Sequence, residues 1–196
     1  LYGNPTWATD GQVNKALSFD GSNDYVELLT NPIDTNFWSI EMWFNIHNAD
    51  QFDMLYSGPD NVDIQLFFNA NTKYLTTSVE NAERATSFKI SDHYNEWHHV
   101  IWTHDNSYHT IVYIDGEIVL DTTDTSYTKS YETIRIGDVV GGSAFYIDGL
   151  IDEVRISNVA RSAAWIKASY YSENNSLVSY GAEEGIDNAI FFSCNF

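Results

Sequence analysis

The strongest constraint on the fold is a series of short runs in which apolar and polar residues alternate, each run ended by a turn. The clearest case is "TIVYIDGEIVL" at residues 110–120, where Asp115-Gly116 separates two alternating apolar runs. This dipeptide favours the positive φ angles of a tight hairpin turn. Similar runs recur about every ten residues, a spacing typical of all-β domains.

Further strands are expected at residues 15–19, 24–28, 38–46, 53–58, 62–68, 74–79, 85–90, 96–104, 131–137, 144–156 and 176–181. The 13 Tyr, 11 Phe and 6 Trp residues also favour sheets. One helix is expected at residues 163–171, with Ser162 as its N-cap and with Ala163, Ile166 and Tyr170 on one face. The sequence therefore predicts an all-β, two-sheet antiparallel jelly-roll β-sandwich with one short C-terminal helix.

The charge of the chain narrows the partners that it can bind. Its 196 residues include 28 acidic and 9 basic residues, a net charge of −19. Such a surface repels nucleic acid and anionic membranes and attracts cations. No apolar run approaches the roughly 18 residues that a membrane helix needs, so membrane insertion is not expected. The single cysteine, Cys194, excludes an intramolecular disulfide.

Three stretches together carry a family resemblance: "ALSFDGSNDYVEL" (16–28), "EWHHVIWTHDNSYHTIVYIDGEIV" (96–119) and "GLIDEVRISNVARSAAWI" (149–166). In this order and at these separations they resemble the laminin-G-like jelly rolls of the concanavalin A-like lectin/glucanase superfamily. The resemblance spans roughly residues 10–172. It implies a binding module, frequently with a structural calcium, in a larger secreted, cell-surface or virion protein. We expect a domain at residues 1–182 and a separate tail at 183–196.

Two aspartates fall in line with apolar residues of expected strands. Asp152 has the same strand parity as Val154, and Asp24 has the same parity as Val26. A carboxylate that faces an apolar core costs several kcal/mol unless a cation, backbone donors or water compensate it. Both positions therefore need a compensating partner.

A calcium ion is the first candidate for that partner. The turn after residue 19 adds oxygens from Asp20 and Asn23, and hard cations require six to eight oxygen ligands. We predict a calcium site formed by Asp20, Asn23, Asp24 and Asp152, with carbonyls of the 19–23 turn. The resemblance implies the same ion, since related jelly rolls join their first hairpin to a late strand through calcium. The alternative is a turn capped by Asp20 and Asp24, with Asp152 bonded to backbone N–H groups.

Two further sets of residues are candidates for ligand binding. Asp60, Asn61 and Asp63 form a second acidic group that could hold a metal at the rim, although Pro-Asp-Asn is also ordinary turn chemistry. Sugar binding needs exposed aromatic rings beside hydrogen-bonding groups. The rings of Tyr74, Tyr108 and Tyr146 are the surface candidates, and burial is the competing interpretation for each.

Catalysis and zinc binding are disfavoured by the spacing of the candidate residues. Jelly-roll glycosidases place two carboxylates on one face of a cleft, but Glu41 stands alone and Asp152 and Glu153 are adjacent. Adjacent His98 and His99 point to opposite faces of a strand, which argues against a shared zinc ion.

We therefore expect a non-catalytic, calcium-stabilised recognition module that binds carbohydrate. A protein-adhesion or structural module of a surface or virion assembly is the alternative, and a glycan-degrading enzyme is the minor one.

Overall fold

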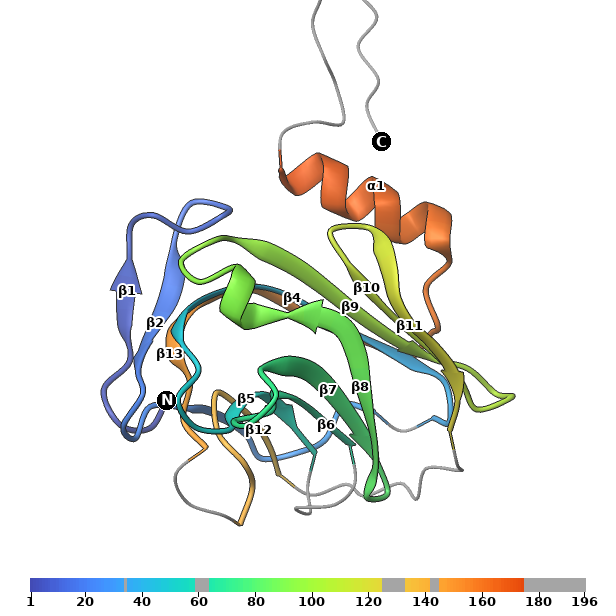
Figure 1. Cartoon of the computed structure of the whole chain (residues 1–196), viewed down its shortest axis with the longest axis horizontal. Coiled ribbons are helices and arrows are strands. Elements are labelled where there is room, and N and C mark those ends of the chain that lie inside the picture. Colours follow the sequence, from blue (N-terminus) through green and yellow to red (C-terminus); the bar gives the residue numbers. More distant parts are fainter. Residues whose placement is uncertain (34, 59–63, 125–132, 142–144, 175–196) are drawn as a thin grey trace, which may run out of the picture.

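The computed structural model describes residues 1–33, 35–58, 64–124, 133–141 and 145–174. In these ranges the chain forms two antiparallel sheets packed as layers, with one α-helix outside the larger sheet (Figure 1). The predicted all-β jelly-roll sandwich with a short C-terminal helix is confirmed. Neither helix in the described ranges has the length and apolar character needed to cross a lipid bilayer.

The larger sheet has seven strands, in the order β1 (Thr6–Ala8), β2 (Ala16–Asp20), β13 (Asp148–Ser157), β4 (Trp38–Asn48), β9 (His98–His104), β10 (His109–Ile114) and β11 (Glu117–Thr123). The smaller has six, in the order β3 (Val26–Leu28), β12 (Ile134–Ile136), β5 (Asp53–Ser57), β6 (Ile64–Phe68), β7 (Tyr74–Val79) and β8 (Ala82–Lys89). A 3-10 turn, η1 (Ile90–Asp92), follows β8, and α1 (Ala163–Glu173) follows β13. Short β1 was not predicted, and the strand expected at 176–181 lies outside the described residues.

The central strand β4 shows why long runs of this sheet are buried on both faces. Alternate residues of β4, including Ile40 and Phe44, enter the core between the sheets. The intervening residues, including Glu41 and Trp43, lie on the outer face, where α1 covers them. The strand therefore has no exposed face over most of its length.

The hairpin predicted at Asp115-Gly116 is confirmed. Asp115 and Gly116 have φ angles of 52° and 80°, and Ile114 pairs with Glu117. Positive φ at both central residues matches the twist of the flanking strands, so the turn closes β10 onto β11 with two residues.

A bulge in β13 overturns the predicted parity of Asp152. Glu153 has a φ of 48°, and the pairing with β4 shifts register between Asp152 and Arg155. An extra residue in one strand moves the following side chains to the other face. Ile151 before the bulge faces the core, and Ile156 after it packs against the same core, whereas Val154, expected in the core line, is 40% exposed.

The predicted N-cap of α1 is confirmed, since the Ser162 hydroxyl accepts a hydrogen bond from the Trp165 N–H at 3.3 Å. Ile166 is buried against Ile101 and Tyr113 on the outer face of the larger sheet. The prediction that Ala163 shares this face is wrong, because Ala163 is exposed. The helix contacts the sheet through its middle and C-terminal turns, as far as Glu173, and its first residue projects beyond the contact.

Candidate functional site

The predicted calcium ligands near the first hairpin hold the turn together through backbone donors. Asp24 is buried, and its Oδ1 accepts a hydrogen bond from the Asn4 N–H at 2.6 Å, while its Oδ2 accepts one from Asp20 N–H at 3.1 Å. Asp20 Oδ1 accepts a bond from Ser22 N–H at 2.9 Å. Each carboxylate here thus bonds to amide hydrogens of neighbouring chain segments.

Gly3 explains how closely the N-terminal segment approaches this turn. It has a φ of 72°, and a Cβ on it would lie 2.3 Å from Asp24 Oδ1 and 2.7 Å from Asn23 Oδ1. Only glycine accommodates both the conformation and the contact. Asn23 and Asp24 therefore lie together beneath the N-terminal segment.

Asp152 lies elsewhere. Its Oδ2 accepts a hydrogen bond from the Val13 N–H at 2.9 Å and its Oδ1 accepts one from Glu153 N–H at 2.8 Å. The sheet register pairs Asp20 with Asp148, four residues before Asp152. At about 3.3 Å per residue, this places Asp152 roughly 13 Å along the strand from Asp20. The structure brings Asp20, Asn23 and Asp24 together and leaves Asp152 apart from them.

An acidic cavity of about 310 Å³ lies beside Asp20, at the end of β2. Its lining residues are Asp20, Gly21, Asn48, Asp50, Gln51, Asp53 and Asp148. We call it the acidic cavity. It joins the end of β2, the start of β5 and the start of β13, three segments far apart in the sequence.

Asp53 is the most unusual group in the acidic cavity. It is 1% exposed, and its Oδ2 has no hydrogen-bond partner among the residues that the structure describes. Burial, which penalises the charged form, raises the pKa of Asp53 to about 8, although the positive charge of Lys73 opposes this. A buried carboxylate oxygen without a donor is costly unless the group is protonated or meets a cation.

The other oxygens of the acidic cavity are held in place by side-chain bonds. Asp148 Oδ1 lies 3.0 Å from His47 Nδ1, and Asp148 Oδ2 accepts a bond from Asn48 Nδ2 at 2.5 Å. Gln51 Nε2 donates to the Tyr146 carbonyl at 2.7 Å and to the Gly21 carbonyl at 3.3 Å. Carboxylate, amide and carbonyl oxygens are the ligands that hard divalent cations prefer.

Sequence reasoning missed Asp53 and Asp148 as candidates. Asp53 has the same strand parity as Leu55, which is the same signal that singled out Asp152. Asp148 is identified only by the sheet register, which pairs it with Asp20. No local sequence pattern indicates that pairing.

A cleft of about 250 Å³ opens on the outer face of the six-stranded sheet. It is lined by Phe52, Met54, Gln65, Phe67, Ser78, Asn81, Glu83 and Phe145. We call it the aromatic cleft. The half-buried rings of Phe52 and Phe145 lie 5.4 Å apart in an edge-to-face arrangement, and Glu83 is exposed at the rim. Apolar rings here stand beside amide, hydroxyl and carboxylate groups.

Among the predicted ligand residues that the structure describes, the three tyrosines do not converge on one surface. Asp60, Asn61 and Asp63 lie outside the described residues. Tyr74 is 36% exposed in β7, whereas Tyr108 lies in the turn between β9 and β10, in the other sheet. Tyr146 is half-buried beside the acidic cavity, where its carbonyl accepts the bond from Gln51.

A larger and more apolar groove of about 490 Å³ runs along the open edge of the sandwich, where β2 and β13 face β3 and β12. Its residues include Trp7, Phe19, Val26, Ile136 and Val154. We call it the edge groove. Trp7 is 67% exposed on its rim.

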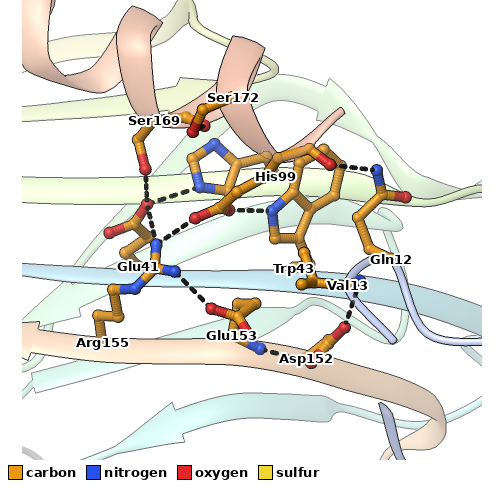
Figure 2. A network of polar contacts seen from close by, with 11 residues as sticks. Gln12, Val13, Glu41, Trp43, His99, Asp152, Glu153, Arg155, Ser169 and Ser172 are labelled. Atoms are coloured by element: carbon orange, nitrogen blue, oxygen red, sulfur yellow. Dashed lines mark hydrogen bonds and ion pairs between the residues drawn. The ribbon is translucent and has the colours of Figure 1, made fainter. Parts of the chain in front are cut away.

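A polar network holds α1 to the larger sheet (Figure 2). Glu41 Oε1 accepts bonds from Ser169 Oγ at 2.6 Å and lies 2.9 Å from His99 Nε2. Arg155 bonds to both Glu41 and Glu173. Burial raises the pKa of Glu41, but the bonds from His99 and Ser169 and the charge of Arg155 together hold that pKa below its usual value.

The same network bears on the enzyme hypothesis. Glu41 and Glu173 are two carboxylates close together, but Glu41 is 2% exposed and the helix lies over it. The guanidinium of Arg155 already supplies the positive charge that a metal would bring to this pair. The arrangement is suited to attaching the helix, because Glu41 is buried beneath it. Glu173 also borders a polar cavity of about 260 Å³, which is lined by Gln12, Val13, Asn14 and Ser172.

Comparison with known proteins places the fold in a family. The family model of the Concanavalin A-like lectin/glucanases superfamily matches residues 20–167. A search of curated protein sequences finds no significant match. One similar structure is domain 4 of AbnA, an extracellular GH43 arabinanase from Geobacillus stearothermophilus, solved in complex with arabinotriose. It is 20% identical to this chain, with a TM-score of 0.68, and the match covers 84% of this chain and 80% of that one.

Two toxin domains have the same fold. The binding domain of Paraclostridial Mosquitocidal Protein 1 is 14% identical with a TM-score of 0.72, covering 88% of this chain and 46% of that one. The receptor binding domain of botulinum neurotoxin D is 17% identical with a TM-score of 0.70, and the match covers 88% of this chain and 47% of that one. The chain thus spans less than half the length of either toxin structure.

Proposed function

The chain belongs to the concanavalin A-like lectin/glucanase superfamily, and on this premise we propose that it is a carbohydrate-binding module of a larger extracellular or cell-surface protein, without catalytic activity. The similar structures are themselves binding domains, one of them solved with an arabinotriose ligand. Fold similarity alone does not identify a ligand, so the site must carry the argument.

The observation that carries this proposal is the composition of the aromatic cleft. Sugar rings stack their C–H faces on aromatic side chains, and their hydroxyls require polar partners at the edge. Phe52 and Phe145 supply the rings, and Asn81 and Glu83 supply polar groups at the rim. A neutral oligosaccharide fits this combination better than an anionic one, because Glu83 and the net charge of −19 both repel anions.

A calcium ion in the acidic cavity is the second part of the proposal. Asp20, Asp53 and Asp148 would hold it, since Asp53 Oδ2 is buried and has no donor in the described structure. Asp53 follows Phe52, and Tyr146, whose carbonyl lies beside the cavity, follows Phe145. An ion here would therefore order both segments that carry the rings of the aromatic cleft.

Glycan-array binding, with and without chelator, tests the proposal. We expect selective binding of neutral glycans, weakened by chelator and restored by calcium. Phe145→Ala and Glu83→Gln should each lower affinity at least about tenfold, the scale of one lost stacking or hydrogen-bonding contact. Trp7→Ala, which removes an exposed ring outside the aromatic cleft, is the matched control.

The control also addresses the alternative function. If Trp7→Ala abolishes binding and Phe145→Ala does not, the ligand occupies the edge groove. The apolar lining of the edge groove favours a protein-adhesion or structural role, because such surfaces bind proteins more readily than sugars. Absence of any glycan signal, together with a specific protein complex sensitive to Trp7→Ala, would replace the proposal with this alternative. Turnover of a glycan substrate would instead support the enzyme hypothesis.

A further inference from the structure

Three potential metal ligands converge at the start of β9, beside the turn formed by η1 (the green single-turn helix between β8 and β9 in Figure 1). His93 Nδ1 lies 3.0 Å from Glu96 Oε2, and His98 Nε2 lies 3.5 Å from the same oxygen. The two imidazole rings are 4.9 Å apart and nearly perpendicular. None of these three residues lines the acidic cavity, and they are far from its residues in the sequence.

The hydrogen bonding of His98 determines which of its nitrogens is free. His98 Nδ1 lies 2.7 Å from Asp115 Oδ2, so Nδ1 carries the proton and donates it to the carboxylate. The opposite nitrogen, Nε2, then presents a lone pair. His98 is 8% exposed, and Nε2 has no hydrogen-bond partner within the described part of the chain. This buried lone pair points toward Glu96 and His93.

A lone pair facing a carboxylate is unfavourable unless a proton or a metal cation lies between them. The separations of 3.0 and 3.5 Å bracket the edge of a zinc tetrahedron, in which ligand atoms about 2.0–2.1 Å from the metal lie about 3.3 Å apart. Asp115 completes the arrangement, because metal-binding histidines almost always donate their second ring N–H to such a carboxylate. The hairpin turn holds Asp115 in place, since Asp115 Oδ1 also accepts a bond from the His99 N–H at 2.9 Å.

We propose that His93, Glu96 and His98 bind a zinc ion, with Asp115 as the positioning residue. Imidazole nitrogens and one carboxylate suit zinc and related transition metals better than calcium. The side chains of His93 and Glu96 are 38% and 59% exposed, so a fourth coordination position faces solvent. The prediction against zinc rested on the strand positions of His98, His99 and His104. His93 lies outside β9, at the C-cap of η1, and this turn brings its ring beside that of His98.

Zinc titration by calorimetry and equilibrium dialysis tests the site. The protein is freed of metal and then kept in excess calcium, which occupies oxygen-rich sites. We expect one zinc ion bound per chain, and bound Co²⁺ with the intense visible absorption of tetrahedral coordination. His93→Ala and His98→Ala should each weaken binding at least about a hundredfold. Asp115→Asn should weaken it about 10- to 100-fold through misorientation of His98.

His109→Ala is the matched control. His109 is 40% exposed and lies 2.7 Å from Asp121, so it resembles His93 in exposure and in having a carboxylate partner. Unlike His93, it belongs to neither group of potential metal ligands found among the described residues. It should bind zinc as the wild type does. If His98→Ala fails to fold, the exposed variants His93→Ala and Glu96→Gln decide the question. No saturable zinc binding, or binding unchanged in both exposed variants, overturns the proposal.

Discussion

At the scale of single residues, the aspartates of this chain show how partners decide the state of a carboxylate. Asp24 and Asp152 are both buried, yet each accepts two backbone N–H bonds. Asp53 is equally buried, but one of its oxygens has no donor in the described structure. Amide donors stabilise the charged form, whereas burial alone favours the neutral one. Of these three carboxylates, Asp53 is therefore the one left needing a proton or a cation.

Asp53 gives a prediction with a defined pH window. Its pKa is raised to about 8 in the folded chain, above the ordinary value of about 4. The folded state therefore holds a proton that the unfolded state releases, and stability falls as pH rises from about 4 through about 8. In chelator, the free energy of unfolding should decline across this window by on the order of 1–5 kcal/mol.

The variant Asp53→Asn serves as the comparison, because it retains the shape of the side chain and removes its titration. Urea unfolding of Asp53→Asn in chelator should show a flatter pH profile and higher stability than wild type at pH 8. Calcium should raise the Tm of the wild type and have little effect on the variant. Parallel pH profiles for the two proteins would contradict the assignment.

His104 predicts the opposite dependence on pH. It is fully buried, stacks on Trp38 and has its Nδ1 2.9 Å from Thr110 Oγ1. Burial lowers the pKa of His104 below 6.5. The unfolded state gains a proton first as pH falls below about 6.5, so stability present above that pH is lost below it. NMR titration of the His104 ring should give a midpoint below 6.5, and a midpoint at or above 6.5 would refute this account.

At the scale of elements, α1 is attached to the sheet by polar contacts as well as by apolar packing. Trp43 Nε1 donates to Glu173 Oε2 at 2.5 Å, and Arg155 bridges Glu173 to Glu41 (Figure 2). The apolar contact of Ile166 is small, since only one helical residue is fully buried. The network therefore supplies the specificity that fixes the orientation of the helix.

Removal of Arg155 tests this attachment. Arg155→Met should leave Glu41 and Glu173 without their guanidinium partner and lower the free energy of unfolding by about 2–3 kcal/mol, somewhat less than for a fully buried pair because Arg155 is 39% exposed. Guanidinium denaturation measures the change. Lys167→Ala, on the same helix, breaks only the exposed pair with Glu117 and should change stability by less than about 0.5 kcal/mol. Equal effects of the two substitutions would show that the network does not hold the helix.

At the scale of the whole molecule, the net charge of −19 acts on every ligand that approaches. A field of this kind repels anions over about a Debye length, roughly 10 Å at 0.1 M salt. It favours divalent cations for the same reason. The proposed neutral sugar and the proposed metal ions are therefore electrostatically consistent with one another.

Salt dependence separates this long-range effect from contacts in the cleft. A neutral oligosaccharide and its sulfated derivative should differ most in affinity at low ionic strength, with the neutral form bound more tightly. The difference should narrow at about 0.5 M salt, where charges are screened within a few ångström. Affinities for both forms that are independent of salt would show that the net charge does not act on the ligand.

The positions of the strands along the chain are predicted by local patterns, because alternation and turn residues act over a few neighbouring positions. The Asp115-Gly116 hairpin and the Ser162 cap are confirmed for this reason. Asp20 was found as a candidate because it stands in a local turn motif. The bulge at Glu153 was not predicted, since a single residue at positive φ reverses strand parity without a compositional signal.

Site geometry required the folded chain. The acidic cavity joins Asp20, Asp53 and Asp148, which lie on strands far apart in the chain. The proposed zinc site depends on Asp115, which the pairing of β9 with β10 places beside His98. Both arrangements are set by the register between paired strands. A local pattern specifies which face of a strand is buried, but the partner across a sheet is chosen by the packing of the whole core, and that choice places the charged groups beside one another.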